Sequence, residues 1–124
     1  MRYISTALCL CVLSCASAWA QTAAVSQITG TVQDSTGLAV PEAQVTVTQT
    51  ETGFVRTVNT SSDGAYNLPS LPIGPYRLEV KKEGFSVYVQ SGIVLQVNTN
   101  PTIDVSLKIG SVNEQVVVEA AAAM

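Results

Sequence analysis

Histidine is absent from this sequence, and cysteine and tryptophan are confined to its first twenty residues. The three cysteines are Cys9, Cys11 and Cys15, and the single tryptophan is Trp19. Without histidine there is no Ser–His–Asp or Cys–His catalytic arrangement, and without a later cysteine there is no zinc site of the usual kind. The rest of the chain has no disulfide to stabilise it, so a hydrophobic core must hold its fold together.

Charged residues are also scarce, and their balance is acidic. Six lysines and arginines face nine aspartates and glutamates, which gives a formal net charge of −3. Nucleic-acid-binding domains usually carry the opposite balance, so the composition argues against a nucleic-acid partner. An anionic membrane surface would repel the chain weakly. The charges are scattered along the sequence, which is typical of an ordinary solvated surface.

The first twenty residues have the layout of a secretory signal peptide. A short basic start precedes an apolar stretch, and Ala18 and Ala20 then place small residues at the two positions that a signal peptidase reads. The apolar stretch is shorter than the ~20 residues of a membrane-spanning helix. We therefore predict cleavage between Ala20 and Gln21 and export of residues 21–124, with no membrane span in the exported chain. Cleavage before Cys15, as in a lipoprotein, is an alternative that the preceding residues fit poorly.

The exported part alternates polar and apolar residues between turns that recur about every eight to twelve residues, which predicts an all-β domain. The clearest strand buries Tyr76, Leu78 and Val80 on one face and leaves the residues between them in solvent. The same alternation marks strands over residues 28–32, 45–47, 66–68, 93–97 and 103–109. Residues 54–60 alternate less cleanly and are expected to form an edge strand. Each apolar face needs a second sheet to cover it, so we predict a seven-stranded β-sandwich over residues 27–109.

Glycine and proline interrupt the middle of the chain. Gly64 follows a Ser-Asp pair and is free to adopt the positive φ of a tight turn. Pro69 and Pro72 cannot donate to a β ladder, so we expect this segment to cross from one sheet to the other without pairing. Leu71 would plug the core from this crossing, and Phe85 would return to the core after a later glycine turn.

Few residues outside the leader offer chemistry. Asp34, Asp63 and Asp104 lie in turns or on outward strand positions, so converging carboxylates for acid–base catalysis are not expected. The turns at Asp34 and Asp63 offer hard oxygens to a calcium ion but fall short of its six to eight ligands. The simpler interpretation is that each aspartate caps its own turn. We therefore predict no enzyme activity, no metal site and no cofactor.

The aromatic residues are the candidates for a sugar site, because exposed rings stack on sugars. Tyr66, Tyr76 and Phe85 fall on inward positions of the predicted strands. Phe54 and Tyr88 are the candidate surface aromatics, although a role for both in or near the core is the stronger interpretation.

The last fifteen residues differ from the domain before them. Residues 110–124 contain three consecutive valines and end in four alanines and a methionine. A globular β domain seldom ends in this way, so we expect a β-rich linker towards a further domain. Residues 21–26 are expected to be a short leader between the signal peptide and the sandwich.

The combined spacing of turn and core residues resembles the carboxypeptidase regulatory-like domain family. The resemblance covers residues 27–109 and is carried by the following residues: Gly30, Gly37, Pro41, Asp63, Gly64, Tyr66, Leu71, Pro72, Gly74, Tyr76, Gly84 and Phe85. It implies a transthyretin-like Greek-key β-sandwich, also described as a carbohydrate-binding-like fold. That label belongs to the fold and does not identify a sugar site here.

A signal peptide, this domain and a β-rich tail in that order are similar to the N-terminus of large TonB-dependent outer-membrane receptors of the Oar-like type. In those receptors a plug and a barrel follow. The resemblance implies a non-catalytic accessory domain with protein partners at the periplasmic face of the outer membrane, and a chain that is a fragment of a longer receptor. The alternative is a free-standing secreted module that binds carbohydrate or another cell-surface polymer. A fragment of a hydrolase is a third hypothesis, because this fold also accompanies carboxypeptidases.

Overall fold

A computed structural model describes residues 24–111 and 115–119 of the chain. Their eight strands are β1 (Val25–Asp34), β2 (Gln44–Gln49), β3 (Val55–Asn59), β4 (Ala65–Pro72), β5 (Gly74–Lys81), β6 (Val87–Leu95), β7 (Val105–Leu107) and β8 (Gln115–Glu119). The predicted signal cleavage residues Ala18, Ala20 and Gln21 lie outside the described residues. None of the described segments is a helix that could span a membrane.

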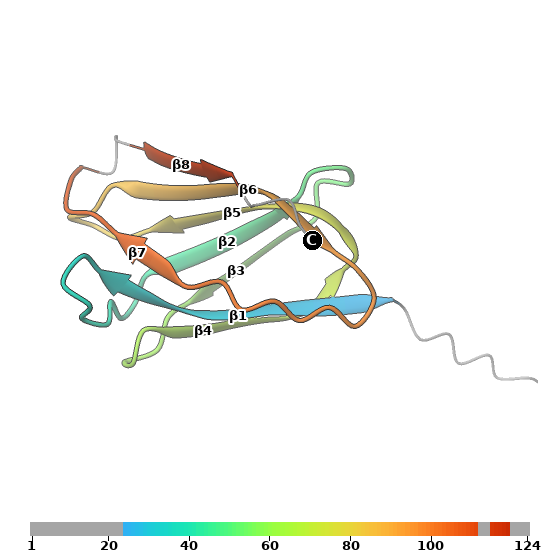
Figure 1. Ribbon diagram of the computed structural model, residues 1–124, viewed down its shortest axis with the longest axis horizontal. Coiled ribbons are helices and arrows are strands. Elements are labelled where there is room, and N and C mark those ends of the chain that lie inside the picture. The colour runs from blue at the N-terminus through green and yellow to red at the C-terminus, as the bar shows by residue number, and fades with distance from the viewer. Residues whose placement is uncertain (1–23, 112–114, 120–124) are drawn as a thin grey trace, which may run out of the picture.

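The strands form two sheets that pack face to face (Figure 1). One sheet has three strands in the order β4-β1-β7, and the other has five in the order β3-β2-β5-β6-β8. The pairs β1–β7 and β6–β8 are parallel, and the other neighbours are antiparallel. This architecture confirms the predicted all-β sandwich. Seven strands lie between Val25 and Leu107, and β8 follows them.

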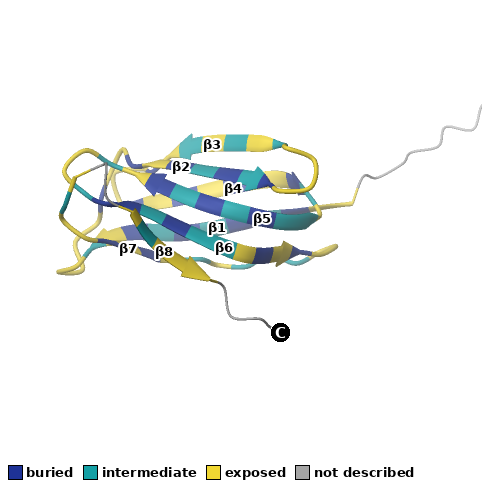
Figure 2. Cartoon of the chain, turned by 90° about the horizontal axis from the view of Figure 1, so that it is seen from above, coloured by how far each residue is buried: buried dark blue, intermediate teal, exposed yellow. Residues whose placement is uncertain are grey.

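The core lies between the sheets, and burial alternates along each central strand (Figure 2). Tyr76, Leu78 and Val80 are at most 1% exposed, as their spacing predicts. The buried residues that pack together are Ile28, Val32, Val40, Ala43, Val45, Val47, Tyr66, Leu68, Leu71, Tyr76, Leu78, Val80, Ile93, Leu95, Val105 and Leu107. The predicted inward positions of the first, second, fourth and fifth strands are therefore confirmed.

β3 is an edge strand, as the weak alternation of residues 54–60 predicts. Among the described strands it pairs only with β2, and its residues are exposed or half-buried in turn. Across the sandwich β3 lies beside β4, the edge strand of the other sheet. One side of the molecule therefore brings two edge strands together.

The expectation that the proline-rich segment crosses between sheets without pairing is wrong. β4 stays paired with β1 as far as Pro72, which lies opposite Val25, and the chain changes sheet only at Gly74. β4 has a neighbour on one side only, which is where proline is tolerated in a sheet. β4 accommodates an extra residue next to Pro69. There Ser70 has a φ of 55° and the register with β1 shifts.

β6 is longer than the predicted strand of residues 93–97 and ends earlier. It runs through a bulge opposite β5, where Gly92 has a φ of 79° and the register shifts by one residue. The bulge changes which residues face the core, so a single alternating phase does not describe the whole strand. Val97 was expected in this strand but lies beyond its end and is 55% exposed.

Two predicted core positions near the C-terminal end are less buried than expected. Ile109 is 82% exposed and lies beyond the end of β7 at Leu107, where residues 108–110 pair with residues 84–86 just before β6. Phe85 is half-buried and packs on the rim of the core. The chain joins these two residues in an isolated antiparallel bridge. The alternation of residues 103–109 thus predicts the burial of Val105 and Leu107 but not that of Ile109.

β8 lies within residues 110–124, the segment that the sequence predicts to be a β-rich linker. It runs parallel to β6, with Val117 opposite Val89 and Gln115 opposite Val87. Val87 and Val89 are each 3% exposed but are not part of the core between the sheets. Val89 also lies opposite Glu79, a residue of the solvent-facing side of β5, so these two valines belong to the outer face. β8 therefore extends the larger sheet and flanks an apolar strip on its outer side.

Candidate functional site

The two candidate surface aromatics do not form a common platform. Phe54 precedes β3 and Tyr88 lies on β6, and β2 and β5 separate these strands in the sheet. Both rings are half-buried and pack against the core. The Arg56 guanidinium carbon lies 5.2 Å from the centroid of the Phe54 ring, and the Tyr88 hydroxyl donates to Gln90 Oε1 at 2.8 Å. Burial also raises the pKa of Tyr88. This geometry favours a packing role for both rings over sugar stacking.

Tyr66 and Gly30 both contact the segment that enters β7 and hold it against β1 and β4. The Tyr66 hydroxyl donates to the carbonyl oxygen of Ile103 at 2.5 Å, and a Cβ on Gly30 would lie 1.8 Å from the same oxygen. Only glycine permits this close approach. Asp104 accepts hydrogen bonds from Thr31 N at 3.0 Å and from its hydroxyl at 3.1 Å. Burial, and then the charge of Asp104, raise the pKa of the Tyr66 hydroxyl far above its usual range.

Two side-chain hydrogen bonds hold the crossing from β4 to β5 in place. The Tyr76 hydroxyl donates to the carbonyl of Pro72 at 2.7 Å. Gln49 is 4% exposed, and its amide nitrogen donates to Ile73 O at 3.0 Å. A Cβ on Gly74 would lie 2.3 Å from that nitrogen, so the glycine makes room for the glutamine. These motif residues therefore hold the backbone in place, and their hydrogen-bonding groups are already engaged.

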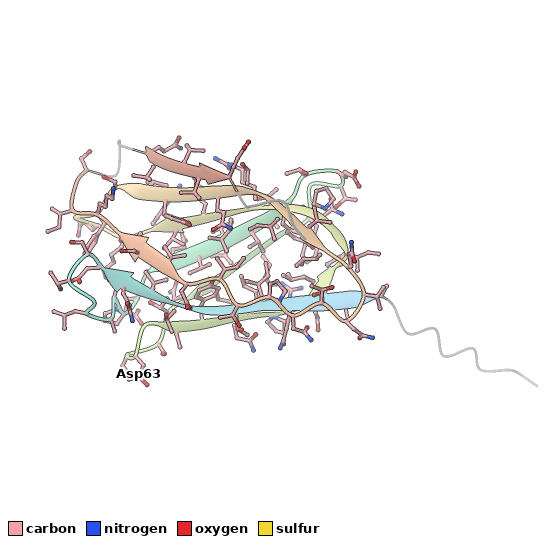
Figure 3. All side chains as sticks on the ribbon, viewed as in Figure 1. Asp63 is labelled. Atoms are coloured by element: carbon pink, nitrogen blue, oxygen red, sulfur yellow. The ribbon has the colours of Figure 1, made fainter. Side chains whose placement is uncertain are left out.

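The aspartates of the two candidate turns behave differently. Asp34 Oδ1 accepts from Thr36 N at 2.8 Å, from the Thr36 hydroxyl at 2.6 Å and from Leu38 N at 3.0 Å. These bonds, that of the hydroxyl most of all, hold the pKa of Asp34 below its ordinary value. Asp63 stands at the tip of the β3–β4 turn and points away from the body of the domain (Figure 3). There the Ser61 hydroxyl oxygen accepts from Asp63 N and from Ala65 N, each at 3.3 Å. Ser61, and not Asp63, caps this turn.

The remaining motif residues shape turns. Gly37, Gly64 and Gly84 all have positive φ values, between 76° and 91°. A Cβ on Gly64 would also lie 2.6 Å from the carbonyl of Val32. Pro41 lies in the exposed turn before β2. Within the described residues there is no group of three histidine, cysteine, aspartate or glutamate side chains that could hold a metal ion.

Several buried or bridging polar residues were not identified from the sequence. Thr60 is 2% exposed, and its hydroxyl donates to Val40 O at 2.7 Å and accepts from Ala43 N at 2.8 Å. Arg56 donates from Nη1 to Pro69 O at 2.6 Å. Threonine and arginine are common on strand surfaces, so nothing in the local pattern distinguishes these two. The run of valines in residues 116–118 was a visible signal for β8.

The two lateral sides of the sandwich differ in how they end. On the first, which we call the closed side, Arg56 of β3 reaches the carbonyl of Pro69 on β4 and joins the two edge strands. On the second, which we call the open side, β7 has only three residues and β8 extends beyond it as the last strand of the larger sheet. Of the strands that the structure describes, only β6 is hydrogen-bonded to β8. The outer edge of β8 therefore has no hydrogen-bonded neighbour among the described strands.

Comparison with known proteins finds a curated relative and solved structures of similar fold. A curated relative, the TonB-dependent transporter Oar of Myxococcus xanthus, is 39% identical over 84 residues, which cover 66% of this chain and 8% of that protein. The chain thus spans a small part of its relative's length. Among solved structures, the Bacillus anthracis TIE protein matches with a TM-score of 0.56 and 20% identity, over 69% of this chain and 17% of that one.

Other solved structures share the fold at still lower identity. Catechol 1,2-dioxygenase from an Acinetobacter species matches with a TM-score of 0.58 and 12% identity, over 82% of this chain and 60% of the enzyme. At such identity the likeness concerns the β-sandwich alone. The sequence model of the carboxypeptidase regulatory-like domain matches residues 27–108, which contain most of β1 and all of β2 to β7. The chain belongs to the carboxypeptidase regulatory-like domain family.

Proposed function

We propose that this chain is a non-catalytic accessory domain of a TonB-dependent outer-membrane receptor, placed at the receptor's N-terminus on the periplasmic side. The observation that carries the proposal is the 39% identity over 84 residues to a TonB-dependent transporter. Since the chain corresponds to 8% of that protein, transport itself would belong to the parts that lie elsewhere. The domain would act through contacts with proteins, either the receptor's own plug and barrel or a periplasmic partner.

The chemistry of the described residues supports a non-catalytic role. The carboxylates of Asp34 and Asp104 are each engaged in two or more hydrogen bonds that fix the backbone. Tyr66 and Tyr76 donate to main-chain carbonyls in the same way. Such groups stabilise the fold and are not oriented towards a common point where a substrate would react.

The two ends of the sequence complete this proposal. Residues 1–20 would be the signal peptide that directs export, and residues 110–124 would lead from the sandwich towards the plug. In this role β8 would form the last part of the domain before the plug. A carbohydrate-binding module is not proposed, because Phe54 and Tyr88 are half-buried and lie on separate strands.

The first experiment is to read the coding DNA beyond Met124. A frame that continues into a plug and a series of amphipathic strands agrees with the proposal, whereas a stop codon directly after Met124 would contradict it. In the full receptor, residues 25–109 should then be replaced by a flexible linker. We expect altered substrate uptake or a lower amount of receptor in the outer membrane. A Leu38→Ser receptor is a suitable control, because Leu38 is 67% exposed in a turn of the same domain. Unchanged uptake and unchanged receptor amount in the linker variant would overturn an accessory role.

A further inference from the structure

The outer edge of β8 has the features of a strand that pairs with another strand. Exposed edges are usually protected by proline, lysine, a bulge or a short length. β8 has five residues and contains neither proline nor lysine. Its centre is three valines, of which Val117 is 62% and Val118 is 37% exposed. The free N–H and C=O groups of such a strand are a template for β-augmentation.

The other strand edges of the sandwich are less suitable. β4 carries Pro69 and Pro72 and a bulge at Ser70. Arg56 bridges β3 to β4 and closes that side. β7 has only three residues, too few for a stable ladder of its own. Among the described strands, β8 is therefore the one that combines length, β-forming residues and an open edge.

We propose that β8 pairs with β8 of a second copy of this chain, antiparallel and about a two-fold axis at Val117. In this register Val117 faces itself, Val116 faces Val118, and Gln115 faces Glu119 of the other copy. The three valine pairs would be buried on both faces of the joined sheet, and each glutamine amide would donate to a carboxylate. A two-fold axis requires such self-complementarity, because the same strand supplies both halves of the interface.

The charge on β8 favours this register over a shifted one. Glu119 is the one charged residue of β8, and in the symmetric register it lies opposite a neutral glutamine. The two Glu119 side chains are then about 14 Å apart along the strands, beyond the Debye length of about 10 Å at 0.1 M salt. A shift of the pairing would leave valines unpaired or bring Glu119 closer to its symmetry mate.

The joined sheet would be large but within the size range of open sheets. Five strands from each copy give about ten strands, the upper end of the range for twisted open sheets. The interface would be small, because it is formed mainly by one five-residue strand from each copy. Interfaces below about 1,200 Å² are weak, so we expect a reversible dimer with a dissociation constant on the order of 10⁻⁴ M. This inference is independent of the proposed role in a receptor.

The test uses residues 21–124, which include all eight strands and the whole core. Sedimentation velocity from about 1 µM to 1 mM should show a monomer–dimer equilibrium. Val117→Lys places two ammonium groups against each other and should raise the dissociation constant at least about tenfold. The matched control is Val55→Lys, on the edge strand of the closed side, where Val55 is 54% exposed. It should leave the equilibrium unchanged.

A cysteine pair tests the register itself. Residues 21–124 contain no cysteine, so a single Val117→Cys substitution gives one thiol in each copy. Directly opposed residues in an antiparallel pair have Cα atoms about 4.5–5.5 Å apart, within reach of a disulfide. Mild oxidation should crosslink Val117→Cys at least about fivefold more than Val55→Cys, even if Val117→Lys fails to fold. A monomer at every concentration, a dimer indifferent to Val117→Lys, or equal crosslinking of the two cysteine variants would overturn the proposal.

Discussion

On the closed side of the sandwich, β3 and β4 lie together and Arg56 joins them through the carbonyl of Pro69. On the open side, the smaller sheet ends with the three-residue β7, whereas the larger sheet continues to β8 (Figure 1). The same chain thus ends its sheets in two ways. On the closed side, the Arg56 side chain and the prolines of β4 protect the strand edges. On the open side, the valine-rich β8 is exposed.

The difference between the two sides indicates which residues stabilise the fold and which are available for association with another chain. Tyr76 and Gln49 both hold the crossing from β4 to β5, and each hydrogen-bonds to a carbonyl of that crossing. Val87 and Val89 on the open side are buried, yet they lie outside the core between the sheets. We therefore expect substitutions in the core and at the crossing to affect folding strongly. Substitutions on β8 should affect association more than folding.

The largest effect is expected from Tyr76→Ala. The ring is 1% exposed in the core, and its hydroxyl satisfies the Pro72 carbonyl. Removing a buried aromatic side chain costs about 3–5 kcal/mol of the free energy of unfolding, because it leaves a cavity. Urea unfolding of residues 21–124 measures this loss, with Tyr88→Ala as the half-buried counterpart on the open side. If the two variants lose equal stability, the core does not depend on the crossing in the way the structure indicates.

A pair of valine substitutions compares the core with the outer face of the open side. Val47→Ala removes two methyl groups from the core between the sheets, where the residue is fully buried. We expect a loss of about 2–3 kcal/mol in the free energy of unfolding, from lost burial and the cavity. Val89→Ala should cost only about 1 kcal/mol, because β8 and the side chains beside it can move into the space. Denaturant unfolding gives both values. A larger loss for Val89→Ala would make β8 a part of the folding core.

The sequence was sufficient for the strands whose residues alternate between one core and solvent. Tyr76, Leu78 and Val80 show this, and so does the turn glycine Gly64. It was insufficient where the pattern depends on distant geometry. The bulge at Gly92 changes the phase of β6, and no local signal shows which strand will lie opposite.

The same limit applies to the rim and to the candidate site. Ile109 continues an alternating run, yet it is exposed and lies beyond the end of β7. Arg56 and Thr60 act through carbonyls and N–H groups far away in sequence. Hydrogen bonds of this kind depend on the path of the backbone, which the residue type does not reveal. The resemblance to a known family identified the fold and the motif residues but gave no roles to Arg56 or Thr60.

A smaller effect is expected from Tyr66→Phe, which tests the link between β4 and the segment before β7. Loss of the bond to Ile103 leaves a carbonyl unpaired and should cost about 1–2 kcal/mol at neutral pH. Burial raises the folded-state pKa of Tyr66 far above the unfolded value of about 10. The unfolded chain therefore releases this proton first, so the contribution of Tyr66 is complete below pH 10 and is lost as the pH rises beyond it.

Urea unfolding between pH 8 and pH 11 checks this dependence. The parent chain should lose stability steeply at the alkaline end, and Tyr66→Phe should flatten that loss. Tyr88→Phe is the control on the open side. Its ring is only half-buried, so it should flatten the loss less. Identical pH dependence in the parent chain and in Tyr66→Phe would mean that another group controls alkaline unfolding.

The smallest effect is expected from Arg56→Ala, which opens the closed side. The variant loses one hydrogen bond to Pro69 O and the contact with the Phe54 ring, and both are near the surface. We expect a loss of about 1 kcal/mol. Arg77→Ala is the matched control, since its 3.9 Å ion pair with Glu79 is partly exposed and should contribute less than about 0.5 kcal/mol. If Arg56 also protects the edge, its removal should expose the β3 edge to pairing and increase self-association in sedimentation velocity. Val117→Lys would not suppress the additional association, because that association would use the opposite side of the sandwich.

If Arg56→Ala and Arg77→Ala are alike in both stability and association, β3 and β4 are held together by backbone and core packing alone, and the closed side does not depend on its arginine.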